Sequence, residues 1–358
     1  MPIARAVLFR LATSGRFERA TRGLPAGERL AWQAASRYVS GTTAADAFEA
    51  ARTLHDRGVG VSIDQFGEQV NDVAVAERVA ADYLRLAGEL GDLPEDAWLS
   101  IDLSHLGLDV DPSGCTDHLA AIAGQLSAGR RIQVGAEDHG RADAVLKSVL
   151  TVAGRGLADR LGATVQANLR RASGDLEKLI AAGVHIRLVK GAYVESTDRA
   201  LPYGEATDIA YLHLAHRLAD GDAPFALATH DGVLREALLA ALGPRPVEQL
   251  LGVRPSTLDD LVARGLPTRV YLPFGTAWFR YWMRRLAESR GSYTQRCPLD
   301  DRLLTHILRR RPMRHDLDQI DAQFVDSCCR AGMSTTSTRC SAASPTKWSS
   351  PRRGRTAT

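Results

Sequence analysis

The segment Val184–Glu195, which reads VHIRLVKGAYVE, decides how this chain is interpreted. Its first half is rich in strand-forming residues, and the strand is expected to end at Lys190, where Gly191 and Ala192 follow. In a barrel of parallel strands, active sites lie at the carboxyl ends of the strands because the loops converge there. The pattern therefore predicts that Arg187 and Lys190 serve a site at this edge. The alternative is that both cations only reach solvent, as most charged residues do.

The alternation of a short β run with a helical stretch recurs along the chain and predicts its fold. Eight strand candidates are present: Val59–Ile63, Leu99–Leu103, Ile132–Val134, Ala163–Gln166, His185–Val189, Phe225–Ala228, Glu248–Leu251 and Arg269–Leu272. The helical candidates after them are Ala74–Glu89, Thr116–Ala128, Arg141–Ala153, Ser173–Ala182, Thr207–Asp220, Gly232–Ala241, Ser256–Arg264 and Ala277–Glu288. Eight such units over roughly 230 residues predict an α/β fold, a (β/α)8 barrel of the TIM type. An open doubly wound sheet is the alternative, although no GxGxxG motif follows the first strand.

Three segments are expected along the chain. Residues 1–55 predict a helical N-terminal extension, with Ala-rich stretches broken by Gly and Pro. Residues 56–288 hold the barrel. Residues 289–358 mix Ser, Thr, Arg, Cys and Pro without a sustained apolar period, so we expect a disordered C-terminal tail with too little apolar surface to offset ordering of its backbone. A tail so unlike the body suggests a shifted reading frame or a fused extension.

Composition excludes several classes of protein. From Ser289 onward the chain holds 13 Lys or Arg against six Asp or Glu, so the net charge of +3 leaves −4 for the first 288 residues. The basic character belongs to the tail, and nothing indicates nucleic-acid binding by the body. Four of the five cysteines lie in the tail, in no spacing typical of a metal site or a disulfide framework. Without a long apolar run or a secretory signal, we expect a cytoplasmic protein.

Two further strand ends carry polar residues that suit ligand binding. Strand four ends with Gln166, whose amide can donate to and accept from a flat heteroaromatic ring, although an ordinary surface Gln is the commoner case. Strand six ends with Thr229, His230 and Asp231 before a helix that begins at Gly232. Because helix N-termini attract anions, Thr229 and His230 are candidates for a phosphate site. For Asp231 we favour the alternative, a helix-capping role.

The last strand and its helix combine aromatic and cationic residues. Tyr271 lies on the strand, and the spacing of three and four residues predicts that Tyr281, Arg284, Arg285 and Glu288 share one helical face. Guanidinium groups bind carboxylates through two hydrogen bonds, so this face suits a small substrate that carries a carboxylate. The alternative is a solvated face with ordinary surface ion pairs.

The segments RLVKGAY, FALATHD, EQLLG, VYLPFG and YWMRRLAE occur in an order that resembles proline dehydrogenases, the FAD-dependent (β/α)8 enzymes of proline catabolism. The resemblance spans about Val59 to Glu288, with SIDQFGE and VGAED as weaker matches. It implies a divergent, monofunctional bacterial member that oxidises L-proline to 1-pyrroline-5-carboxylate by hydride transfer from the C5 carbon to flavin N5. It also implies a quinone as electron acceptor, reached by peripheral contact at the inner face of the membrane.

The resemblance implies a flavin half and a substrate half of one site. In the flavin half, the arginine beside flavin N5 that stabilises the reduced ring corresponds to Arg187. The segment along the flavin corresponds to Lys190, Gly191 and Ala192, and the amide bonded to the ring corresponds to Gln166. The contacts to the FAD phosphates and adenosine correspond to Thr229 and His230. In the substrate half, the pair that binds the proline carboxylate corresponds to Arg284 and Arg285. The wall and lid of the pocket correspond to Tyr271, Tyr281 and Glu288.

Three positions depart from the pattern of the family. Typical members carry a Lys where this chain has Asp102, an Asp where it has Gly135, and a Tyr where it has Asn168. An aspartate beside a substrate carboxylate would repel it. The departures leave alternatives open: a dehydrogenase of another cyclic imino acid, or a flavin-binding paralogue without turnover. A third is a protein that folds poorly because of its tail.

Overall fold

The computed structural model describes residues 18, 27–67, 69–193 and 195–291, all within one compact unit, while the side chains of 284 and 286–291 are not described. Eight parallel strands form a closed barrel in which each strand pairs with the next and β8 pairs with β1. The strands are β1 Val59–Gln65, β2 Ala97–Ile101, β3 Ile132–Val134, β4 Leu161–Gln166, β5 His185–Val189, β6 Phe225–Leu227, β7 Val247–Leu250 and β8 Thr268–Phe274. The predicted (β/α)8 barrel is confirmed, and the open doubly wound sheet is excluded.

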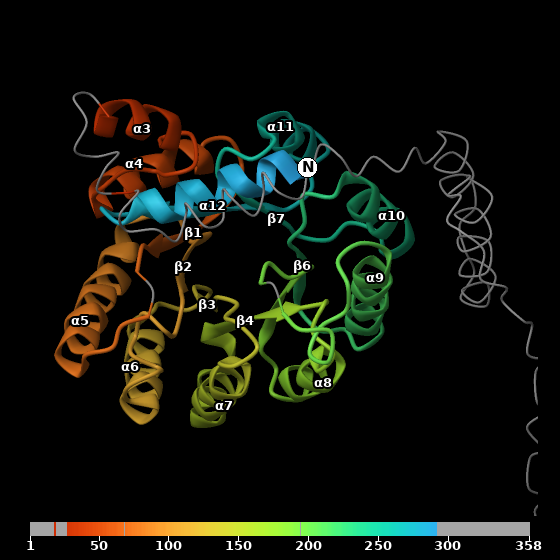
Figure 1. The fold of residues 1–358 in the computed structure, drawn as a ribbon, viewed down its shortest axis with the longest axis horizontal. Helices are drawn as coiled ribbons and strands as arrows, with labels where there is room; N and C mark the ends of the chain where they lie inside the picture. The colour runs from red at the N-terminus through yellow and green to blue at the C-terminus, as the bar shows by residue number, and fades with distance from the viewer. Residues whose placement is uncertain (1–17, 19–26, 68, 194, 292–358) are drawn as a thin grey trace, which may run out of the picture. The chain divides into compact units, whose positions relative to one another are not determined.

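Helices surround the barrel and follow the strands in order (Figure 1). They are α5 Val73–Glu89, α6 Pro112–Gln125, α7 Ala142–Val152, α8 Ala172–Ala181, α9 Glu205–Asp220, α10 Gly232–Leu242, α11 Pro255–Ala263 and α12 Trp278–Gly291, preceded by α3 Gly27–Ala35 and α4 Ala44–His55. The last helix continues three residues past the predicted boundary at 288, since no helix breaker precedes Gly291. The rest of the predicted tail lies outside the described residues. In the part of the chain that is described, no helix is long and apolar enough to span a membrane.

The strands alternate between an apolar outer face and a polar inner face. On β1, Val59, Val61 and Ile63 belong to the main apolar core, which fills the space between sheet and helices. The intervening Ser62 instead receives a hydrogen bond from Arg187 of β5, a strand that is not adjacent in the sheet. Such a contact is possible only across the interior of the barrel. Hydrophobic burial therefore stabilises the outside of the sheet, and the inside is left for polar chemistry.

A second apolar cluster joins the N-terminal helices to the last helix. Its buried members are Ala31, Ala35, Val39, Trp278, Phe279, Tyr281 and Met283. The rings of Trp32 on α3 and Trp278 on α12 meet edge to face, with centroids 5.2 Å apart. As a result, α12 lies beside α3 (Figure 1), which fixes the helix whose face was predicted to bind substrate.

Candidate active site

Arg187 lies inside the barrel, where it is only 8% exposed. Its Nε atom lies 2.5 Å from Oε2 of Glu248 on β7, and a terminal nitrogen donates to Oγ of Ser62 over 3.1 Å. A buried guanidinium requires such partners because an unpaired charge in the interior is costly. The alternative in which Arg187 only reaches solvent is therefore wrong.

Lys190 follows β5 and is held by two carboxylates. Its Nζ atom lies 2.5 Å from Oδ1 of Asp208 on α9 and 2.7 Å from Oδ2 of Asp231. Burial disfavours the ammonium, but the hydrogen bonds to both carboxylates outweigh it and raise the pKa of Lys190. Asp231 also accepts from the backbone N–H groups of Val233 and Leu234 at the start of α10, which confirms its predicted capping role. Lys190 thus stays charged and fixed in place.

Gly191 and Asn168 fit together at the ends of β5 and β4. Gly191 has a φ of +114°, a conformation that favours glycine. A Cβ at this position would lie 1.9 Å from Oδ1 of Asn168, so a side chain there would displace the amide. Oδ1 of Asn168 is buried and has no hydrogen-bond partner among the described residues. It can therefore accept from a donor on a ligand. Ala192, next along the chain, is exposed.

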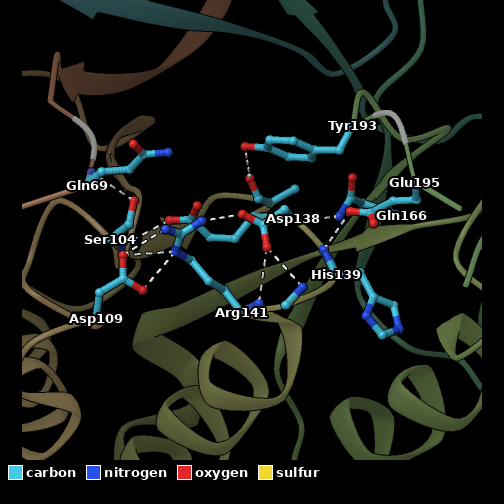
Figure 2. Close-up of polar contacts among 12 residues, drawn as sticks. Gln69, Ser104, Asp109, Asp138, His139, Arg141, Gln166, Tyr193 and Glu195 are labelled. Atoms are coloured by element: carbon cyan, nitrogen blue, oxygen red, sulfur yellow. Dashed lines mark hydrogen bonds and ion pairs between the residues drawn. The ribbon is translucent and has the colours of Figure 1, made fainter.

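Gln166 is buried at the end of β4 and bonds to a neighbouring loop. Its Nε2 atom donates to the carbonyl oxygen of Glu137 over 2.8 Å (Figure 2). Oε1 of Glu137 accepts in turn from the backbone N–H of Ser104 over 3.0 Å. These two bonds tie the loops after β2 and β3 to the end of β4, where Gln166 was predicted to serve a ligand.

A polar network extends this support along one side of the barrel mouth (Figure 2). Arg141 lies between Asp109 and Asp138, and its Nε atom donates to Oδ1 of Asp109 over 2.8 Å. The hydrogen bond to Asp109 raises the pKa of Arg141, so this centre is permanently charged. The hydroxyl of Tyr193, in the loop after β5, donates to the carbonyl oxygen of Ala136 over 3.0 Å. The network therefore fixes the loops that follow β2, β3 and β5 relative to one another.

His230 follows β6 and presents one defined donor. Its Nε2 atom accepts from the backbone N–H of Leu250 over 3.2 Å, so Nδ1 carries the proton of the neutral ring. Burial, with the nearby charges of Arg285 and Arg254, lowers the pKa of His230 to about 3. Nδ1 is buried and has no hydrogen-bond partner in the described part of the chain. Thr229, beside it, accepts from the backbone N–H of Asp231 over 3.1 Å.

Two tyrosines share the carboxylate of Asp64, near the end of β1. Tyr83 donates to Oδ1 of Asp64 over 2.9 Å, and Tyr271 of β8 donates to Oδ2 of the same residue. Burial and the negative charge of Asp64 raise the pKa of Tyr271 well above its ordinary value. Tyr271 is therefore a neutral phenol whose proton is directed at Asp64.

The helix α12 places Tyr281 beside Tyr271, and Arg285 over the ring of Tyr281. The ring centroids of the two tyrosines are 6.2 Å apart, and Cζ of Arg285 lies 5.1 Å from the centroid of Tyr281, within cation–π range. The structure thus brings together three of the five residues predicted for the substrate half. Arg284 and Glu288 lie on the same helix, but their side chains are outside the described part.

The flavin-half and substrate-half residues meet at one end of the barrel. The positive charge of Arg285 on α12 is close enough to lower the pKa of His230 after β6. The departures from the family pattern also lie here: a Cβ on Gly135 would come within 1.7 Å of Oδ1 of Asp102. The two substituted positions are therefore in contact and depend on one another.

Sequence reasoning did not assign roles to Glu248, Asp208 or Asp64. Glu248 is the partner of Arg187, Asp208 is a partner of Lys190, and Asp64 accepts from the two tyrosines. A signal for two of them was present, since Glu248 lies in a run that predicts a buried strand and Asp64 directly follows another such run. Asp208 gives no such signal, because it lies in the first turn of a helix, where acidic residues are ordinary.

Comparison with known proteins identifies relatives over most of the chain. Residues 47–295 match the proline dehydrogenase family model. The chain is 31% identical to a proline dehydrogenase of Deinococcus radiodurans over 280 residues, which cover 74% of this chain and 90% of that protein. It is 32% identical to proline dehydrogenase 1 of Bacillus subtilis over 266 residues, covering 71% of this chain and 86% of that one.

Solved structures with the same fold are parts of larger proteins. Proline utilization A from Bdellovibrio bacteriovorus, inactivated by N-propargylglycine, matches with a TM-score of 0.68 and 16% identity over 84% of this chain and 38% of that one. A proline utilization A variant from Bradyrhizobium japonicum matches with a TM-score of 0.64 and 21% identity over 81% and 36%. These similarities show the fold alone. The family match and the sequence relatives show that this chain belongs to the proline dehydrogenase family.

Proposed function

We propose that this protein oxidises L-proline to 1-pyrroline-5-carboxylate and uses FAD as the hydride acceptor. The observation that carries the proposal is the convergence of two walls at one barrel mouth. One wall supplies hydrogen-bond donors and a fixed cation, His230 and Lys190, and the other supplies an arginine stacked on a tyrosine, Arg285 and Tyr281. A dinucleotide and a small amino acid carboxylate need these two kinds of surface side by side.

The residues of the first wall fit the cofactor. Nδ1–H of His230 is a buried donor without a partner among the described residues, as a phosphate or ribose oxygen requires. Gly191 leaves its backbone approachable and, with Asn168, adds an acceptor that a ring N–H can use. We assign Arg187, Gln166, Lys190, Gly191, Ala192, Thr229 and His230 to FAD binding. Bound FAD supplies the flavin that accepts the hydride.

Arg187 is oriented for an electrostatic role toward the flavin. Glu248 and Ser62 hold its Nε and one terminal nitrogen, so the guanidinium cannot swing away. A cation fixed in this way would stabilise negative charge on a bound flavin without having to reorganise. Glu248 balances the positive charge of Arg187 inside the barrel, so the buried guanidinium stays compensated when a flavin carries no negative charge.

The second wall fits the substrate. A guanidinium such as that of Arg285 pairs with a carboxylate, and its stacking on Tyr281 restricts its position. Tyr271 lies beside Tyr281 and, as a neutral phenol bonded to Asp64, offers a rigid surface for an aliphatic ring. We assign Arg284, Arg285, Tyr271, Tyr281 and Glu288 to proline binding. The proposed electron acceptor that reoxidises the flavin is a quinone at the membrane surface.

A second candidate is the oxidation of another cyclic imino acid. Asp102 favours it, because a carboxylate at this mouth changes the electrostatic environment of any substrate carboxylate. The same flavin chemistry would apply, and only the ring or its substituents would differ.

A visible spectrum of the purified protein before and after anaerobic addition of L-proline tests the proposal. We expect an oxidised flavin spectrum that bleaches on addition of L-proline. A persistent flavin spectrum with L-proline but bleaching with another cyclic imino acid would favour the second candidate. A flavin-loaded protein that stays oxidised with every imino acid tried would leave only a flavin-binding paralogue, and the proposal would be wrong.

A further inference from the structure

Asp102 lies at the barrel mouth on the inner face of the sheet. It follows β2, on which Trp98 contacts His185 of β5 across the interior, and alternation along the strand carries Asp102 to the same inner face. Its carboxylate lies against Gly135, the residue after β3, where a Cβ would come within 1.7 Å of Oδ1. Gly135 therefore provides the room that this orientation of Asp102 needs.

The surroundings of Asp102 indicate that its negative charge acts on the substrate side of the mouth. That charge contributes to raising the pKa values of Tyr83 and Tyr271, after the larger effects of burial and of Asp64. Two carboxylates thus lie on the β1–β2 side, whereas Arg285 lies on α12. The carboxylate of Asp64 already accepts from both tyrosine hydroxyls.

A zwitterionic imino acid fits this division of charge. At neutral pH, L-proline carries a carboxylate and a ring ammonium, and a cation and an anion held on different elements of the mouth orient such a molecule in one direction only. With Arg285 on the carboxylate, the carboxylate of Asp102 is suited to accept the hydrogens of the ring ammonium. In that orientation Asp102 attracts the substrate and does not repel it.

We propose that Asp102 is a specificity-determining residue that recognises the ring ammonium of the substrate, and that Gly135 is required because it seats this carboxylate. The inference rests on the proposed function. It predicts discrimination between L-proline and its oxygen analogue, tetrahydrofuran-2-carboxylate, which keeps the carboxylate but has a ring oxygen in place of the ammonium. The ring oxygen of the analogue can only accept hydrogen bonds and gains nothing from a carboxylate.

The test compares wild-type protein with the Asp102→Asn variant, both loaded with flavin. Initial rates give KM and kcat for L-proline, and competitive inhibition with calorimetry gives the dissociation constant of the analogue. Loss of a charge-assisted hydrogen bond should raise KM for L-proline roughly tenfold to hundredfold, with a smaller change in kcat. The dissociation constant of the analogue should stay the same or fall.

A second pair of variants separates position from charge. Gly135→Ala keeps the charge of Asp102 but displaces its carboxylate, and it should raise KM for L-proline as Asp102→Asn does. Gly162→Ala is the matched control, since a Cβ there would come within 2.2 Å of Oε1 of Gln133, deeper in the same barrel. The control should leave the ratio of the L-proline and analogue constants unchanged.

Each remaining outcome decides the inference. If Asp102→Asn tightens both ligands, Asp102 only repels the carboxylate; if it weakens both equally, its role is structural. Both results overturn the inference and leave the proposed function intact. Wild-type protein that neither turns over L-proline nor binds the analogue overturns the proposed function, and this inference with it.

Discussion

Replacement of Glu248 by Gln should destabilise the protein strongly, because Glu248 is the carboxylate that balances Arg187 inside the barrel. The substitution keeps the shape and an acceptor oxygen for Nε of Arg187, which now lies 2.5 Å from Oε2, but it removes the negative charge. Breaking a buried ion pair by removing one partner typically costs about 3–5 kcal/mol. We expect a loss of about 3 kcal/mol in the free energy of unfolding, a large share of the total for a typical domain.

The surroundings of Glu248 support a value of this size. Burial lowers the pKa values of Arg131 and Arg269, that of Arg269 to about 9, and the charge of Glu248 acts against this lowering in both. Arg269 also lies over the ring of Trp98, with Cζ 3.2 Å from its centroid. One carboxylate therefore serves three guanidinium groups, and its loss leaves all three less well compensated.

A double-mutant cycle measures the coupling directly. Urea unfolding at neutral pH gives the free energies for the parent, Glu248→Gln, Arg187→Met and the combined variant. Because the combined variant leaves neither charge of the pair, it should lose about 3 kcal/mol less than the sum of the two single losses. Additive losses, or a Glu248→Gln cost below about 1 kcal/mol, would show that water screens this pair and that the reasoning is wrong.

Two other substitutions test the barrel interior. His185 is buried with a pKa lowered to about 3, by burial first and then by nearby arginines, so between pH 6.5 and 3 the unfolded chain binds a proton that the folded chain does not. As the pH decreases through this window, His185 should therefore lower the free energy of unfolding by about 1.4 kcal/mol per pH unit. The substitution His185→Gln should make this decrease less steep between pH 6.5 and 5. An unchanged slope would contradict the expectation. Gly191→Ala should lower the unfolding temperature and the flavin content more than Gly204→Ala, because both positions have φ near +115° but only Gly191 faces Asn168, 1.9 Å from the added Cβ. Equal effects would mean that backbone strain alone is responsible.

The barrel could be predicted from the sequence because its strands and helices carry local signals. Runs such as Val59, Val61 and Ile63, each followed by helical periodicity, depend on residues close together in the chain. The capping role of Asp231 was predictable for the same reason, since it needs only the next three residues.

The pairing of side chains inside the barrel could not be predicted in this way. Arg187 and Glu248 are 61 positions apart, and they meet only because the sheet closes and its register sets both on the inner face. Of the two cations predicted to serve a site at this edge, Lys190 directly follows β5, whereas Arg187 lies within the strand and is buried inside the barrel. The carboxylate partner of Lys190 on α9 likewise depends on how that helix packs against the barrel.

At four places in the barrel, a glycine on a strand or just after it makes room for a polar side chain that comes from the preceding strand. The space of a missing Cβ is taken by a neighbour in four cases: Asp102 at Gly135, Gln133 at Gly162, Asn168 at Gly191 and Arg269 at Gly60. In each case the polar side chain leans from one strand or its end toward the next strand around the barrel, with β8 leaning toward β1. A glycine receives the side chain at each of these four positions, whereas Arg187 is held by Glu248 and Ser62 instead.

This arrangement changes how substitutions in the site should combine. In many barrels of this class, Val, Ile and Leu fill the interior in layers, and a substitution there mainly costs packing energy. Here the apolar packing lies outside the sheet, so an interior substitution redirects a polar side chain instead. A side chain can be introduced at Gly135 only together with a shorter or repositioned residue at Asp102. Because the two positions are sterically coupled, this mouth should change its substrate preference through paired substitutions, and single changes at either position should be the damaging ones.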